Sequence, residues 1–180
     1  MIDPAVSWIA AIAASLIFAA SAIMKLRDLE LFESAVINYR ILPRFLAKLF
    51  ARLIPIVELG GALALVWPAA RAAGAAIILF LLVIFTLGIA INLMRGRYDV
   101  DCGCFGPALR QTLSWWLVLR NAALAALAAI LLLRPNGRTL TMLDNFTIVC
   151  GVITILLIYA SINYVFANLP RLREIGARYA

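Results

Sequence analysis

The sequence predicts an all-α, polytopic membrane protein built as one helical bundle. Of its 180 residues, 66% are hydrophobic and only 14% are charged, whereas a soluble domain is roughly 45–50% apolar and about 25% charged. The apolar residues fall in blocks of the length, roughly 20 residues, that a helix needs to cross a hydrocarbon core of about 30 Å. Because lipid offers no hydrogen-bond partners to the backbone, such blocks are expected to be helical. We expect residues 1–180 to form a single integral membrane domain.

Five apolar blocks are expected to cross the membrane, as a core of four transmembrane helices plus a C-terminal fifth. Their approximate ranges are 5–24, 53–69, 72–94, 113–133 and 146–166. The N-terminus lacks the positive n-region of a cleavable signal peptide, so the first block is expected to be retained as a span.

Residues 25–52 predict an amphipathic interfacial helix after the first span. Pro43 interrupts this stretch, and beyond it Arg44, Lys48 and Arg52 fall four residues apart on one helical face, with leucines on another. This pattern is typical of a helix that lies in the membrane interface with its basic side toward lipid phosphates.

The net charge of +7 comes from basic residues at the ends of the apolar blocks. There they meet lipid headgroups and set orientation, so the partner that the charge indicates is the lipid bilayer and not nucleic acid. One set of faces carries Lys25, Arg27, Arg40, Arg44, Lys48, Arg52, Arg95, Arg97, Arg110, Arg171, Arg173 and Arg178, and the other carries Arg71, Arg134 and Arg138. The positive-inside rule therefore predicts an external N-terminus and a cytoplasmic loop between the third and fourth spans.

That loop, residues 95–112, contains two of the three cysteines, Cys102 and Cys104, separated by Gly103. Thiols this close can form a disulfide, and a bond closed over so short a loop departs from relaxed geometry and is more oxidising. The pattern favours thiol–disulfide exchange with Cys102 and Cys104 as the catalytic pair. Binding of Cu(I) by the same soft thiolates is the alternative. A closed zinc site is not expected, because it needs four ligands and the chain has no histidine.

Polar residues inside the apolar blocks predict a supporting cluster beneath this loop. Glu58 and Arg120 lie about five and seven residues into their spans from the cysteine side, which is roughly 8–10 Å of helix. Asn92, Asn121 and Asn163 lie at similar depths. Ionisable groups in a membrane need partners, so we expect a Glu58–Arg120 ion pair that either shapes the thiol site or only fixes helix packing.

Cys150 is not expected to be the resolving thiol. It lies near the opposite end of its span, about 13 residues or roughly 20 Å of helix from Asn163. A lone cysteine in an apolar block usually behaves as a small hydrophobic residue.

Several short motifs resemble those of the MauE family of methylamine-utilisation membrane proteins, within the wider DoxX-like group. They are Met24-Lys25-Leu26, Asn38-Tyr39-Arg40-Ile41-Leu42-Pro43, Glu58 before a glycine pair, Ile91-Asn92-Leu93 with Arg95-Gly96-Arg97, Cys102-Gly103-Cys104-Phe105-Gly106, and Arg120-Asn121. The resemblance covers roughly residues 5–133, and the run CGCFG is its most specific part.

The resemblance implies a multi-pass protein of the bacterial cytoplasmic (inner) membrane that supports maturation of an exported client. That client would be the disulfide-rich small subunit of periplasmic methylamine dehydrogenase, and a thioredoxin-like protein would exchange electrons with Cys102 and Cys104. A periplasmic partner requires external thiols, whereas the charge count predicts cytoplasmic ones. The family role therefore implies either the opposite orientation or a different electron carrier, such as a membrane quinone. A DoxX-like scaffold or transporter is a further alternative.

Overall fold

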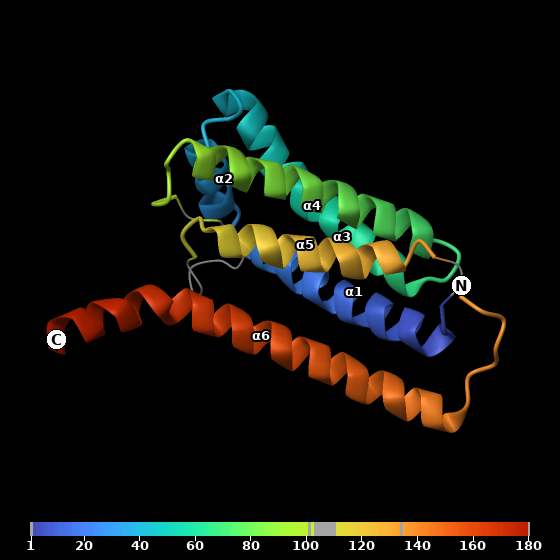
Figure 1. Cartoon of the computed structure of the whole chain (residues 1–180). Coiled ribbons are helices and arrows are strands. Elements are labelled where there is room, and N and C mark those ends of the chain that lie inside the picture. Colours follow the sequence, from blue (N-terminus) through green and yellow to red (C-terminus); the bar gives the residue numbers. More distant parts are fainter. Residues whose placement is uncertain (1, 101, 103–110, 134, 180) are drawn as a thin grey trace.

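The computed structural model describes residues 2–100, 102, 111–133 and 135–179, which fold into helices (Figure 1). The helices are α1 (Pro4–Arg27), α2 (Leu29–Asn38), α3 (Arg44–Val66), α4 (Arg71–Met94), α5 (Trp115–Ile130) and α6 (Met142–Tyr179). The all-α expectation is thus confirmed for the described residues.

Four of these helices are long and apolar enough to cross a membrane, namely α1, α3, α4 and the part of α6 over Met142–Asn168. The predicted fourth span is shorter than expected. Helix α5 has 16 residues, or about 24 Å, against a hydrocarbon core of about 30 Å. A count of five crossing helices therefore stays a prediction, although α5 runs beside α1 and α4 along the bundle (Figure 1).

Helix α1 lies at the centre of the bundle and packs against α2, α3, α5 and α6, while α4 packs against α3 and α5. Its small buried residues, among them Ala10, Ala11 and Ala14, let the neighbouring helices approach closely. The N-terminus and the C-terminus lie at opposite ends of the bundle (Figure 1).

Large apolar side chains cover the outside of the bundle. Phe45 is 77% exposed, Phe80 65% and Phe146 71%, and these residues belong to α3, α4 and α6 respectively. A soluble monomer rarely exposes so much apolar surface, whereas lipid tails accept it readily. The outer surface thus supports the membrane assignment independently of helix length.

The predicted interfacial helix is only partly correct. A short helix, α2, does follow α1, but residues 44–52 are not part of a separate helix. They form the first turns of α3, which continues through Pro55 to Val66. Ala47 and Ala51 are fully buried, and Ala51 packs in a cluster with Phe32 of α2. The face that carries Ala47 and Ala51 is therefore covered by protein, and this packing joins the segment to the bundle. The leucine face stays open, since Leu46, Leu49 and Leu53 are 45%, 47% and 50% exposed.

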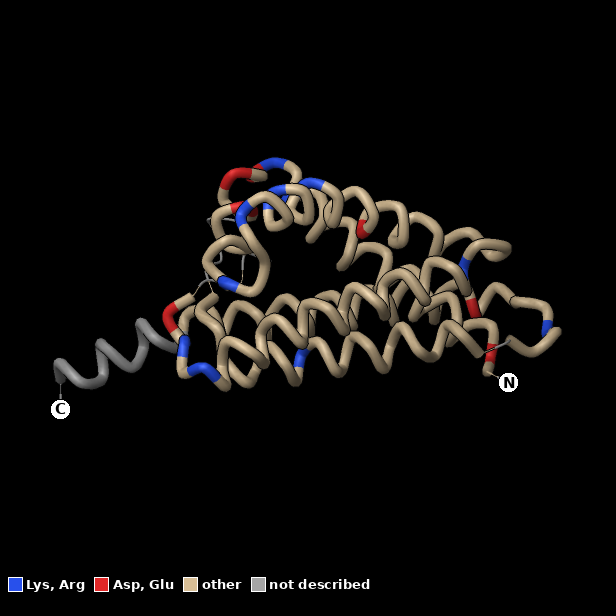
Figure 2. The backbone as a smooth tube through the Cα atoms, turned by 90° about the horizontal axis from the view of Figure 1, so that it is seen from above, with Lys and Arg blue, Asp and Glu red and all other residues tan. Residues whose placement is uncertain are grey.

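Charged residues are concentrated near the two ends of the bundle (Figure 2), and the end that carries α2 holds most of the basic ones. At the opposite end, Arg138 donates to the carboxylates of Asp3 and Asp144 at 3.1 and 2.9 Å and so links the start of α1 to the start of α6. The hydrogen bond from Arg138 lowers the pKa of Asp3, so this link is present at neutral pH and is lost as the pH falls through the range where Asp3 becomes protonated.

Helices α3 and α4 meet through two glycines. A Cβ atom built on Gly74 would lie 2.8 Å from the carbonyl oxygen of Gly61 and 2.9 Å from the Cβ of Ala64. Since backbone atoms supply part of this contact, the two helices can approach this closely only without a side chain at position 74. The neighbouring Gly60 has open space around it.

We predict that Gly74→Ala forces α3 and α4 apart and lowers the free energy of unfolding by about 1–3 kcal/mol, the usual cost of overpacking. Gly60→Ala is the matched control and should be neutral or slightly stabilising, because alanine is the better helix former. Unfolding in mixed micelles would measure both. Equal stability of the two variants would contradict the close contact.

Candidate functional site

Cys102 lies at the α2 end of the bundle, where the segment after α4 folds back onto α5. Its backbone N–H donates to the carbonyl of Gln111 at 2.9 Å, and Leu113 N–H donates to the carbonyl of Val100 at 3.0 Å. The residue is only 6% exposed and packs with Ile89 of α4 and Leu117 of α5. These contacts fix the backbone of Cys102 on the ends of two helices.

Cys102 is disulfide-bonded, whereas Cys150 is a free thiol. Cys150 is exposed on α6 near the end of the bundle opposite Cys102, in line with the expectation that it is not the resolving thiol. Cys104 lies outside the described residues, so its predicted role stays a prediction.

The turn between α2 and α3 is held beside Cys102 by the segment that follows α4. Arg97 donates to the carbonyl of Tyr39 at 3.4 Å and to Asn92 Oδ1 at 3.0 Å, and Arg95 donates to the carbonyl of Arg40 at 3.4 Å. Arg40 has a φ of +50°, a conformation that is uncommon for a residue with a side chain. The Tyr39 hydroxyl in turn donates to the carbonyl of Cys102 at 3.5 Å. Two motifs that are far apart in the sequence therefore support the same segment.

Glu58 pairs with Lys25 and not with Arg120, so the predicted ion pair is wrong. Lys25 Nζ lies 2.7 Å from Glu58 Oε2, and the two side chains are 3% and 2% exposed. The ammonium also lies over the rings of Phe85 and Phe32, at 4.6 and 5.4 Å from their centroids. Burial makes each charge costly on its own. The 2.7 Å contact between Lys25 and Glu58 and the aromatic rings beside the ammonium offset that cost.

Arg120 instead joins α5 to α6 through amide groups. Its Nη1 donates to Asn163 Oδ1 at 3.1 Å and to Gln111 Oε1 at 3.3 Å, and its Nη2 donates to Asn121 Oδ1 at 3.4 Å. Gln111 completes the arrangement by donating to the carbonyl of Asn163 at 3.1 Å. Since Gln111 also accepts from the N–H of Cys102, this network reaches the cysteine segment.

The residues of the predicted supporting cluster fall into two groups in the structure, and their role at the thiol site stays a prediction. Glu58, Arg120 and Asn121 line a shared cavity of about 30 Å³ together with Lys25 and Tyr159, which is large enough for a water molecule. Asn92 belongs to the other part, with Arg97 and the Tyr39 carbonyl.

The residues that sequence reasoning missed are Lys25, Tyr39 and Gln111. Lys25 has the position of an ordinary charge at the end of a span, and Gln111 lies in a loop. Lys25 and Tyr39 did carry a signal, since each lies within one of the motifs quoted above. No pattern in the sequence indicates which of them contact each other, because the contacts join separate helices.

The fold and the site together define a class, an integral membrane helical bundle with a disulfide-bonded cysteine at one end. The family model described as methylamine utilisation protein MauE matches residues 3–134. The chain is 41% identical to "Methylamine utilization protein MauE" of Paracoccus denitrificans, over 89% of this chain and 87% of that protein. It is also 41% identical to the protein of the same name from Methylorubrum extorquens, over 81% and 80% of the two chains.

This chain belongs to the MauE family. The match spans α1 to α5 and includes Cys102, the Lys25–Glu58 pair and Arg120, while α6 lies beyond it. No solved structure matches the chain.

We predict that Lys25→Met and Glu58→Leu each destabilise the protein by about 3–5 kcal/mol, since each leaves an uncompensated buried charge. The double variant should be much less destabilised than the sum of the two, because it leaves no charge behind. Unfolding measurements on the three variants would test this. Lys48→Met, which breaks the exposed contact to Glu33, is the control and should cost less than about 1 kcal/mol. Additive losses in the double variant would contradict a coupled pair.

Proposed function

We propose that the protein is a thiol–disulfide redox factor of the bacterial inner membrane that supports maturation of an exported protein. The observation that carries the proposal is the disulfide-bonded state of Cys102 at the end of a membrane bundle. Cys104 is its proposed partner, two positions along the chain, so that the pair alternates between a disulfide and a dithiol. Exchange proceeds when a thiolate attacks a disulfide sulfur and forms a mixed disulfide, which the second thiol then resolves.

The surroundings of Cys102 would keep its sulfur in place during exchange. The protein contacts described above hold its backbone on two sides, which limits how far the sulfur moves when the disulfide opens. Within the described residues no three His, Cys, Asp or Glu side chains come together as a metal site. Cu(I) binding by Cys102 and Cys104 is nevertheless an outcome that the experiments below distinguish.

Family membership supports the choice of client. The relatives carry the name methylamine utilization protein, so we propose the small subunit of methylamine dehydrogenase as the client and a thioredoxin-like protein as the redox partner. In this scheme the protein is an accessory oxidoreductase. The Lys25–Glu58 pair and the Arg120 network hold the helices beneath the cysteines and take no part in electron transfer.

We predict that Cys102 and Cys104 are oxidised in cells. In a Cys150→Ser background, a membrane-permeant maleimide should label the protein only after reduction. An impermeant maleimide used after reduction in intact cells would report which side of the membrane carries the pair. Full labelling without reduction, unchanged after exposure to oxidant, would refute disulfide exchange, and copper that co-purifies with the protein and is lost in a double Cys→Ser variant would establish the metal alternative.

We predict that the double variant Cys102→Ser/Cys104→Ser fails to support growth on methylamine in a strain that lacks its own MauE protein. Cys150→Ser is the matched control and should grow normally, because this thiol is free and lies toward the other end of the bundle from Cys102. Western blotting of membranes would confirm that all variants accumulate. Normal growth of the double Cys→Ser variant, with loss of growth in Glu58→Ala, would instead favour a scaffold or transporter.

A further inference from the structure

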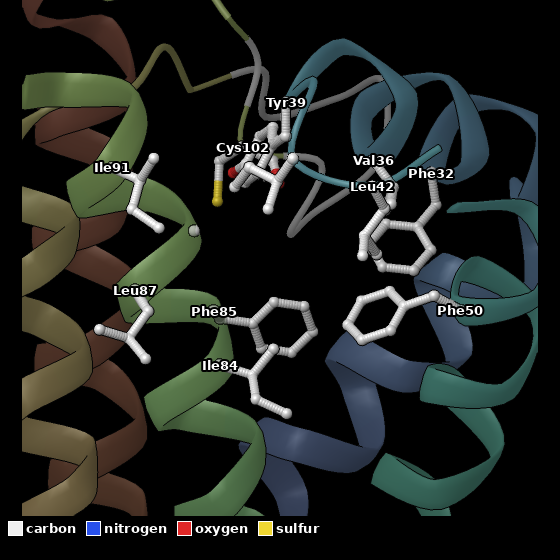
Figure 3. A pocket seen from close by; sticks show the side chains of 12 residues that line it. Phe32, Val36, Tyr39, Leu42, Phe50, Ile84, Phe85, Leu87, Ile91 and Cys102 are labelled. Carbon is white, nitrogen blue, oxygen red and sulfur yellow. Dashed lines mark hydrogen bonds between the residues drawn. The ribbon is translucent and has the colours of Figure 1, made fainter. Parts of the chain in front are cut away.

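An apolar cavity of about 340 Å³ lies between α2, α3 and α4, directly beside Cys102 (Figure 3). Its volume falls within the roughly 300–1,000 Å³ of small-molecule sites. The residues that line it are Phe32, Val36, Tyr39, Ile41, Leu42, Phe50, Ile84, Phe85, Leu87, Gly88, Ile91 and Cys102. None of these side chains is charged, so the cavity suits an uncharged and largely apolar ligand.

The cavity has an aromatic interior and one hydroxyl near its mouth. Phe85 of α4 and Phe50 of α3 point toward each other across it, and the Cys102 sulfur points into it from the end that Tyr39 occupies (Figure 3). Among the lining residues Tyr39 alone bears a hydroxyl, 3.5 Å from the carbonyl oxygen of Cys102. A flat ring in this cavity would meet aromatic side chains along its walls and a hydroxyl and a sulfur at one end.

The cavity is accessible to molecules dissolved in the bilayer. Leu87, which lines it, is 55% exposed, and Ile41 and Leu42 are 40% and 38% exposed. Since Leu87 continues the exposed apolar face that Phe80 and Val83 form on α4, a ligand can enter laterally from the membrane beside this helix. Access of this kind does not depend on which side of the membrane carries the cysteines.

We propose that this cavity binds the ring of an isoprenoid quinone, which serves as the electron acceptor for the cysteine pair. This inference rests on the proposed thiol–disulfide function and names the chemical class of its oxidant. A lipid acyl chain matches the apolar walls equally well, but it gives no role to the sulfur at the edge of the cavity. A quinone matches both the walls and the sulfur.

The reaction balances without a further co-reactant. The two thiols lose two electrons and two protons as the sulfur–sulfur bond forms. The quinone gains the same two electrons and two protons, so that both carbonyl oxygens become the hydroxyls of a quinol. The quinol then leaves into the bilayer, and the new disulfide is available to oxidise the thioredoxin-like partner.

The test uses full-length protein in nanodiscs, reduced with dithiothreitol and then freed of reductant. Addition of a short-chain ubiquinone should yield one quinol for each disulfide formed, followed by the ultraviolet absorbance of the quinone and by maleimide labelling. Ile84→Trp, which fills the cavity, should slow this step by about tenfold or more. Val83→Trp is the matched control. It places the same bulk one residue away, on a side chain that is 53% exposed and outside the cavity lining, and it should react like the wild type.

Thermal unfolding would verify that the variants are folded, and Val36→Phe is a milder filling variant to be used if Ile84→Trp is not. Wild-type rates in a folded cavity-filling variant would overturn the proposal and leave the cavity to lipid. Failure of quinone to oxidise the dithiol, while oxidised glutathione does so, would also overturn it but would leave the proposed exchange function intact. Failure of both oxidants would refute that function as well.

Discussion

Polar groups inside this bundle have to satisfy one another, because the surrounding lipid cannot. Apolar side chains gain little by leaving lipid for a protein interior, so close packing and polar contacts decide how membrane helices associate. The contact of Lys25 with Glu58 joins α1 to α3, and that of Arg120 with Asn163 joins α5 to α6. Gly74 and the small residues of α1 allow the approach that these contacts require. The arrangement of the helices therefore depends on a few buried polar pairs more than on the many leucines.

The cysteine segment lies where these constraints converge. Its backbone is bonded to the strand-like segment before α5, its carbonyl accepts from Tyr39, and the turn that carries Tyr39 is held by Arg95 and Arg97. These partners come from three parts of the sequence, namely the turn between α2 and α3, the segment that follows α4 and the segment before α5. Reactive groups built on rigid elements keep their geometry better than groups on isolated loops. This placement gives Cys102 a fixed backbone beside a cavity that is open to lipid.

Composition and periodicity were sufficient for the helical membrane class, because spanning segments have little freedom in length or polarity. Depth along each helix also placed Asn92, Arg120 and Asn121 at the cysteine end.

The predicted pairing of Glu58 failed, since Lys25 lies near the end of a span and looks like a charge that only orients the helix. The start of α3 was misplaced because the basic residues of 44–52 suggest a separate interfacial helix, whereas the buried Ala47 and Ala51 pack this segment against the bundle as the first turns of α3. The position of a residue within a span gives its depth in the membrane, but it does not give the neighbouring helix that the side chain faces.

Lys25, Arg95 and Arg97 have two roles, one during membrane insertion and one in the folded protein. During insertion each of them adds to the bias that orients the chain, since an isolated helix with a cation near its end can extend that side chain toward the interface. Once α3 is in place, the charge of Lys25 is cancelled by Glu58, and both arginines donate to backbone carbonyls of the α2–α3 turn. Lys25 thus contributes positive charge only until it meets Glu58, whereas Arg95 and Arg97 keep their charge in the folded protein, because a neutral carbonyl does not cancel it.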